Sequence, residues 1–201
     1  MRKTDINVNC NKGIKNREKL RSEIKVYPNV SRVTEDGFTY IRGVLVVNKK
    51  YNIPPTYNPG INKVAFEALK DLQADANTKG YSMSIISGFR SYDRQTELYN
   101  EYVLQNGKDV ADTFSAKPGH SEHQTGLAFD VGNISDEFGN TEAGMWLASN
   151  SHNYGFIIRY PKGKENITGY KYEPWHIRYV GTVIAKEIYN NKLCLEEYLE
   201  V

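Results

Sequence analysis

Residues 121–130, with the sequence Ser-Glu-His-Gln-Thr-Gly-Leu-Ala-Phe-Asp, constrain the fold more than any other stretch of this chain. If the second half is a β-strand, its successive side chains point to opposite faces. One face then carries small residues and a carboxylate, from Gly126, Ala128 and Asp130. The other carries large apolar side chains, from Leu127, Phe129 and Val131. We therefore expect a strand with a hydrophobic core on one face and room for a bulky group on the other.

A candidate metal site combines this strand with residues 173–179, Glu-Pro-Trp-His-Ile-Arg-Tyr. His123 lies just before the strand and can reach the face of Asp130, while the second stretch adds Glu173 and His176. Three nitrogen or oxygen ligands, an open fourth position and a nearby carboxylate base are typical of a catalytic zinc site. The alternatives are a surface salt bridge for Glu173 and a strand-end cap for Asp130.

The two remaining histidines are weaker candidates for metal binding. His120 lies in the same loop as His123. His152 lies near the end of a predicted helix, where a capping or solvent-facing role is favoured. We therefore leave both out of the expected ligand set.

Length and composition indicate an ordinary globular domain. A chain of 201 residues, 25% charged and 39% hydrophobic, is long enough to bury a core as one domain. The net charge of +2 gives no electrostatic case for nucleic acid, so we expect no such partner. The basic N-terminus lacks the apolar stretch of a signal peptide, so none is expected. Cys10 and Cys194 could form one bridge, but two separate thiols are favoured.

The pattern of elements predicts an α+β fold. We expect residues 1–37 to be a polar leader, with a possible short helix over residues 16–24, and residues 38–201 to form one catalytic domain. Strands are expected at residues 38–41, 44–47, 81–87, 156–160 and 175–180, besides the strand ending near residue 131. Helices are expected at residues 62–79, 91–107, 141–154, 182–190 and 195–199. Such a mixture is typical of a single domain with a small, mainly antiparallel sheet flanked by helices.

The chain also resembles a known enzyme family. The pattern Ser-x-His-x-x-Gly-x-Ala-x-Asp, followed by Glu-x-Trp-His, is similar to that of the zinc D,D-peptidases. This family includes VanX, VanY, the bifunctional VanXY enzymes and bacterial L,D-carboxypeptidases, and its general fold is shared by Hedgehog signalling domains. The resemblance extends from about residue 44 to about residue 198 and includes residues 87–91 and 154–160. VanY-type carboxypeptidases match best in length and layout.

The resemblance implies a role for each matching residue. It makes His123, Asp130 and His176 the zinc ligands. Glu173 becomes the base that takes a proton from the attacking water and returns it to the leaving amine. Arg90 becomes the group that polarises the scissile carbonyl and stabilises the oxyanion. The substrate contacts it implies are Ser121, Trp175 and Gln95.

The activity implied is a zinc-dependent D,D-carboxypeptidase of the glycopeptide (vancomycin) resistance type, which removes the C-terminal D-Ala from peptidoglycan stem peptides. The alternatives are an L,D-carboxypeptidase acting on tetrapeptide stems and a bifunctional D,D-dipeptidase and carboxypeptidase. A different class is a non-catalytic, zinc-bearing binding domain, but Glu173 and Arg90 together favour turnover. The loop at residues 161–172 is expected to decide which peptide is accepted.

The same resemblance sets the expected partner and location. The partner would be a peptidoglycan precursor or muropeptide ending in D-Ala, and we expect the chain to act as a monomer. It would work at the extracytoplasmic face of the bacterial cell envelope if an export segment has been removed, and otherwise in the cytoplasm.

Overall fold

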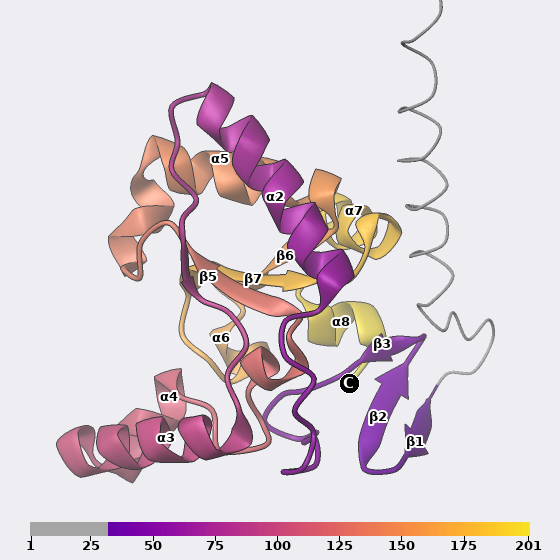
Figure 1. Ribbon diagram of the computed structural model, residues 1–201, viewed down its shortest axis with the longest axis vertical. Helices are drawn as coiled ribbons and strands as arrows, with labels where there is room; N and C mark the ends of the chain where they lie inside the picture. The colour runs from indigo at the N-terminus through magenta and orange to yellow at the C-terminus, as the bar shows by residue number, and fades with distance from the viewer. Residues whose placement is uncertain (1–31) are drawn as a thin grey trace, which may run out of the picture.

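The computed structural model describes residues 32–201, which form an α+β fold with two antiparallel sheets (Figure 1). The first sheet has the order β1-β2-β3, from β1 (Val33–Glu35), β2 (Phe38–Ile41) and β3 (Val44–Leu45). Its β1 begins before residue 38, where the domain was expected to start. The expected helix at residues 16–24 and Cys10 lie outside the described residues.

The second sheet holds the strand predicted to organise the fold. Its order is β4-β5-β7-β6, from β4 (Ile85–Ser87), β5 (Ala128–Val131), β7 (Glu173–Tyr179) and β6 (Phe156–Tyr160). All three pairings are antiparallel. The predicted α+β class with a small antiparallel sheet is therefore confirmed.

The helices are α2 (Lys63–Thr78), α3 (Tyr92–Asn106), α4 (Lys108–Phe114), α5 (Glu142–Asn150), α6 (Glu165–Thr168), α7 (Thr182–Asn191) and α8 (Leu195–Leu199). Helices α2, α3, α5, α7 and α8 lie where helices were predicted, whereas α6 lies within residues 161–172, which were expected to be a loop. Short 3₁₀ helices are η1 (Glu122–Thr125), η2 (Asp136–Asn140) and η3 (Ser151–Tyr154). Asn62 and Ser91 each accept a hydrogen bond from a backbone N–H of the helix that follows, as N-caps do. In residues 32–201, no helix is both long and apolar enough to cross a membrane.

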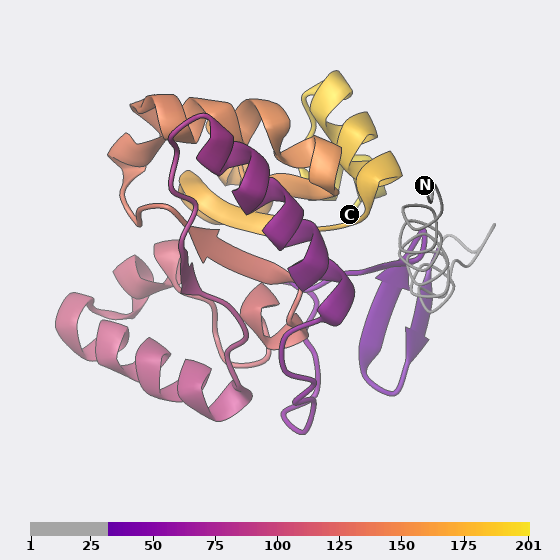
Figure 2. The same cartoon turned by 45° about the horizontal axis from the view of Figure 1, so that its top comes forward.

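The two faces of the main sheet have different surroundings. Helices α2 and α5 cover one face, whereas α3 and α4 lie on the other side (Figures 1 and 2). Buried apolar side chains of β5 and β7 meet those of α2 on the covered face, among them Phe129, Val131, Ile177, Leu69 and Leu72. The alternation predicted for residues 126–131 is therefore present, and the opposite face of β5 and β7 remains free for the site.

One predicted strand was wrong in both length and burial. Residues 81–87 were expected to form a buried strand, but β4 covers only Ile85–Ser87. It is an edge strand, and Ile85 and Ile86 are 38% and 47% exposed. The reason is positional: β4 has a neighbouring strand on one side only, so its apolar residues are less enclosed than those of β5.

Candidate metal centre and active site

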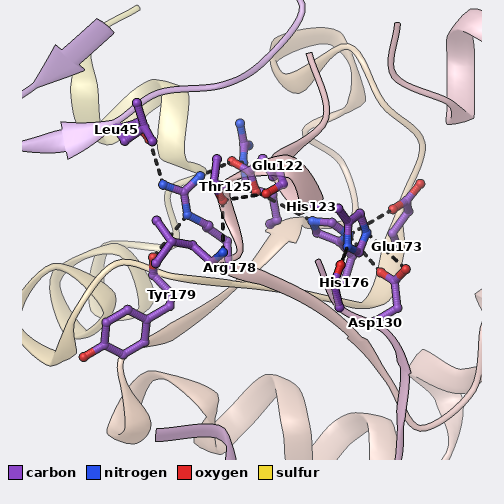
Figure 3. Close-up of polar contacts among 12 residues, drawn as sticks. Leu45, Glu122, His123, Thr125, Asp130, Glu173, His176, Arg178 and Tyr179 are labelled. Atoms are coloured by element: carbon purple, nitrogen blue, oxygen red, sulfur yellow. Dashed lines mark hydrogen bonds and ion pairs between the residues drawn. The ribbon is translucent and has the colours of Figure 1, made fainter. Parts of the chain in front are cut away.

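The pairing of two central strands creates the core of the site. Asp130 of β5 and His176 of β7 are direct partners in the antiparallel register. Side chains of such partners lie on the same face, so the carboxylate and the imidazole must meet. His123 Nε2 lies 3.2 Å from Asp130 Oδ2, and His176 Nδ1 lies 2.9 Å from Asp130 Oδ1 (Figure 3). The three buried side chains offer ligand atoms within 4.8 Å of one another.

The 3₁₀ helix η1 holds His123 in place. Gln124 donates from Nε2 to the carbonyls of Pro54 and Tyr57, at 2.9 and 3.1 Å. Gly126 then ends η1 in the left-handed region, with φ of 69°, which turns the chain into β5. His123 Nδ1 lies 2.7 Å from the carbonyl oxygen of Gly88. Because that oxygen can only accept, Nδ1 carries the proton and Nε2 is left to bind a metal.

Burial and charge set the protonation of the three candidate ligands. Burial by itself would raise the pKa of Asp130, but His123 and His176 hold it well below its usual range. Burial lowers the pKa of His123, so its ring is neutral. Burial also works against a charged His176, yet the hydrogen bond to Asp130 and the nearby carboxylate of Glu122 raise its pKa to about 9. A metal must displace that proton, so metal binding should strengthen as pH rises.

The donor set fits a zinc ion. Two imidazole nitrogens and one carboxylate oxygen are ligands that zinc takes in catalytic sites, where a fourth position stays open. The buried Nε2 of His176 has no hydrogen-bond partner among residues 32–201, and it belongs to the ring whose Nδ1 faces Asp130. The imidazole of His176 is thus oriented to bind a cation through Nδ1.

Glu173 lies beside this group because β7 is irregular. Ile158 pairs with Ile177 and Tyr160 pairs with Glu173, so two steps along β6 match four steps along β7. This irregularity brings Glu173 Oε2 to 4.0 Å from His176 Nδ1. Burial is the main cause that raises the pKa of Glu173 to about 7; nearby His176 opposes the shift and Asp130 adds to it. A carboxyl group with this pKa can both take up and release a proton near neutral pH.

Arg90 is fixed by two hydrogen bonds at the edge of the same site. Its Nη1 donates to Gln95 Oε1 at 2.8 Å and its Nη2 donates to Ser87 Oγ at 2.9 Å. Gln95 is buried and also donates from Nε2 to the carbonyl of Ala116 at 2.6 Å. Both ends of the Gln95 amide are therefore bound within the protein, so Gln95 holds Arg90 in place, and its contact with a substrate stays a prediction.

A cavity of about 520 Å³ opens onto the metal group and Glu173. Ser121 and Trp175, two of the predicted substrate contacts, line it, as do Arg90 and Gln95. Its aromatic wall comes from Tyr102, Phe114, Tyr160, Tyr170 and Trp175. A cavity of this size, in which aromatic side chains lie beside convergent polar and charged groups, can hold a small molecule or the end of a peptide.

The other two histidines lie away from the metal group. The Nδ1 of His120 lies 2.8 Å from the carbonyl oxygen of Asn48. The ring of His152, in the last turn of η3, stacks on Tyr189 with ring centres 3.7 Å apart. Among the described residues, the group that could hold a metal ion consists of His123, Asp130 and His176.

A buried ion network behind the metal group was not predicted. Glu122 Oε1 accepts from Arg159 Nε at 2.7 Å and from Arg178 Nη1 at 2.8 Å. Arg159 also pairs with Glu196 of α8 at 2.6 Å. The sequence did contain a signal for this network: Arg159 and Arg178 each lie within a predicted strand beside apolar residues. An arginine is almost never fully buried unless it is paired, so a buried acidic partner could have been expected.

Comparison with known proteins agrees with this geometry. A family model described as "VanY: D-alanyl-D-alanine carboxypeptidase" matches residues 58–182. This chain belongs to the VanY family. A D-alanyl-D-alanine carboxypeptidase of Enterococcus faecalis is 37% identical to this VanY-family chain, over 82% of the chain and 68% of the relative.

Two solved structures resemble this VanY-family member along most of its length. The LdcB LD-carboxypeptidase is 46% identical, with a TM-score of 0.79, covering 85% of this chain and 95% of its own. A glutamate-to-alanine mutant of the vancomycin resistance D,D-pentapeptidase VanY, solved in complex with Zn(II), is 38% identical, with a TM-score of 0.69. That match covers 77% of this chain and 97% of the VanY chain.

Proposed function

We propose that this chain is a zinc-dependent carboxypeptidase that removes the C-terminal D-alanine from peptidoglycan stem peptides. The observation that carries the proposal is the buried group of His123, Asp130 and His176, with Glu173 beside it in an open cavity. Membership of the VanY family supports the reaction class. Because stem peptides belong to the cell envelope, we expect the enzyme to act at its extracytoplasmic face.

Zinc would be held by the two imidazoles and the Asp130 carboxylate. When bound, it supplies a Lewis acid that polarises the scissile carbonyl and makes water a stronger acid. The related VanY pentapeptidase, whose glutamate-to-alanine mutant was solved with Zn(II), supports this choice of metal. Asp130 already provides one carboxylate, so Glu173 remains free for proton transfer.

Glu173 is assigned to move the proton. Its carboxylate would take a proton from the attacking water and then deliver it to the nitrogen of the departing D-alanine. Burial, which raises the pKa of Glu173 to about 7, suits both steps because the group is then neither a very weak base nor a very weak acid. Removal of such a group typically costs ~10²–10⁴ in rate.

Arg90 is assigned to the developing oxyanion. Each of its two terminal nitrogens uses one N–H within the protein and has a second N–H available for the cavity. Negative charge grows on the carbonyl oxygen only as the tetrahedral state forms, so a fixed guanidinium favours that state over the substrate. Gln95 and Ser87 hold the group in position, so little reorganisation is needed during the reaction.

Two peptide substrates fit this chemistry, and they differ in the residue before the scissile bond. A tetrapeptide presents an L-centre there and a pentapeptide presents D-alanine. The sequence motifs that this chain shares with VanY-type D,D-carboxypeptidases favour the pentapeptide. The higher identity and TM-score with LdcB, 46% and 0.79 against 38% and 0.69, favour the tetrapeptide. We therefore take L,D-hydrolysis as the first candidate and D,D-hydrolysis as the second.

Mass spectrometry of defined muropeptides tests this function. The zinc-loaded protein is incubated with the tetrapeptide, the pentapeptide, free D-Ala-D-Ala and a C-terminally amidated tetrapeptide. We expect D-alanine release from the tetrapeptide first and none from the amide. Binding of these peptides without release would instead indicate a non-catalytic binding domain, and equal cleavage of the amide would exclude an exopeptidase.

A further inference from the structure

The carboxylate of Glu122 lies directly behind the metal group and is completely buried (Figure 3). Its two oxygens have different surroundings. Oε1 accepts hydrogen bonds from Arg159 and Arg178. Oε2 lies 3.6 Å from His176 Nε2, and neither atom has a hydrogen-bond partner in the part of the chain that the structure describes. These two orphaned buried atoms face each other across a short gap.

Their chemistry is complementary. An imidazole that binds a cation through Nδ1 carries its proton on Nε2, and a carboxylate oxygen is the strongest acceptor available for that proton. The gap is only ~0.4 Å beyond the range of an N–H···O hydrogen bond. Burying a polar atom without a partner is unfavourable, and a hydrogen bond between these two atoms would satisfy both of them.

We propose that Glu122 is a positioning residue, whose Oε2 accepts the Nε2–H of His176 and thereby fixes this ring with Nδ1 toward the metal. This inference rests on the proposed function, since it concerns the same zinc. Carboxylates that bond the far nitrogen of a ligating histidine fix its tautomer and raise its basicity. Their removal typically weakens metal binding ~10–100-fold.

The two arginines make this role possible. A lone carboxylate at this depth would have no countercharge, but Arg159 and Arg178 both donate to Oε1, at 2.7 and 2.8 Å, and so compensate the buried negative charge. They also leave Oε2 as the only oxygen free for His176. Glu196 of α8 pairs with Arg159 from the other side without contacting His176, and so orients that guanidinium.

The competing interpretation is that Glu122 only neutralises the two arginines. It would then affect folding stability but not metal affinity in the folded protein. Glu122→Gln separates the two interpretations. The two arginines would keep the amide oxygen at the position of Oε1, which turns the NH₂ group toward His176 Nε2–H, so that two donors oppose each other. Glu196→Gln is the matched control, since it removes a buried carboxylate from the same Arg159 and leaves His176 untouched.

Zinc affinity is measured by competition with a chromophoric chelator, after circular dichroism has shown that each variant is folded. We expect Glu122→Gln to bind zinc ~10–100-fold more weakly than the parent. Glu196→Gln should keep the parent's affinity, even if its unfolding temperature falls. Unchanged affinity in Glu122→Gln, or an equal loss in both variants, would overturn the positioning role.

A second measurement covers the case in which Glu122→Gln does not fold. Nitrogen-15 spectra of the zinc-loaded parent should show His176 bound through Nδ1, with a slowly exchanging proton on Nε2. Glu122→Asp keeps the charge for the arginines but withdraws the carboxylate, so that proton should exchange faster. A zinc-bound Nε2, or rapid exchange in the parent, would refute the proposal. If the parent itself binds no zinc, the proposed function fails as well, whereas a zinc-binding, active parent with an unaffected variant refutes the role of Glu122 alone.

Discussion

Glu173 and His176 are three residues apart on β7, yet the irregular pairing with β6 lets both reach the metal group. At the scale of single residues, the burial of Glu173 destabilises its charged form. The folded protein keeps Glu173 protonated up to a pKa of about 7, against an ordinary value of 4.5. The contribution of protonated Glu173 to the free energy of unfolding is fully present below pH 4.5 and is lost as the pH rises through about 7.

Because the pKa of Glu173 is raised on folding, removing the negative charge of Glu173 should stabilise the zinc-free protein at alkaline pH. Glu173→Gln resembles the protonated acid at every pH. It should therefore exceed the parent in free energy of unfolding by about 3 kcal/mol at pH 8, and by almost nothing at pH 4.5. Urea unfolding of both zinc-free proteins at the two pH values measures the difference. A difference that does not change with pH would contradict the shifted pKa.

Arg90 is the residue for which shape should matter as much as charge. Arg90→Lys keeps the positive charge but loses the planar fork that binds Gln95 and Ser87 together. We expect turnover to fall by ~10²-fold or more with a smaller change in KM, because the lost contacts belong to the transition state. The control is Arg94→Lys, the same change at an exposed arginine of α3 that pairs with Glu97. Normal turnover in Arg90→Lys would make Arg90 a structural residue.

At the scale of elements, the junction between η1 and β5 leaves no room for a side chain at Gly126. Gly126 has a positive φ, and a Cβ there would lie 2.1 Å from the carbonyl oxygen of Gly60. Gly126→Ala should lower the free energy of unfolding by about 3 kcal/mol or more, from backbone strain plus a backbone clash. Gly80→Ala is the control, because Gly80 has a similar φ with open space around it, and it should lose only about 1 kcal/mol. Thermal or urea unfolding of both variants decides, and equal losses would show that the clash relaxes.

Some elements could be predicted from a single stretch of sequence, whereas others depend on contacts between distant segments. Helix α2 could be predicted because its cap at Asn62 and its apolar spacing are both contained in one stretch. The exposure of Ile85 and Ile86 could not, because it depends on β4 lying at the edge of the sheet. The two-residue irregularity in β7, and with it the position of Glu173, depends on pairing with β6.

The same distinction holds within the site. His123, Asp130, His176 and Glu173 were predicted because their residue types have few other uses in such a pattern. Glu122 was missed because a glutamate beside a loop usually faces solvent. Its burial depends on Arg159 and Arg178, which lie far along the chain and reach it only in the folded sheet. Contacts between distant strands, rather than local sequence, therefore determine the second layer of this site.

At the scale of the whole molecule, zinc should stabilise the fold, because the ligands come from η1, β5 and β7, which are brought together only on folding. Free zinc at 1,000-fold its Kd should add ~4 kcal/mol. For a chain of this size, that raises the unfolding temperature by roughly 8–16 °C. Differential scanning calorimetry with zinc and with a chelator measures the shift. His176→Ala should show almost no shift, and a parent that also shows none would argue against a metal site.

The central claim is that three side chains hold zinc while Glu173 moves the proton, and two assays on purified Glu173→Ala test it most directly. Elemental analysis should find zinc at the level of the parent, in contrast to His176→Ala, which should lose most of it. Release of D-alanine from the preferred muropeptide should fall at least ~10²-fold, the lower end for loss of a general acid–base. Loss of zinc from Glu173→Ala would make Glu173 a ligand, and retained D-alanine release would remove it from the mechanism; either result would contradict the account.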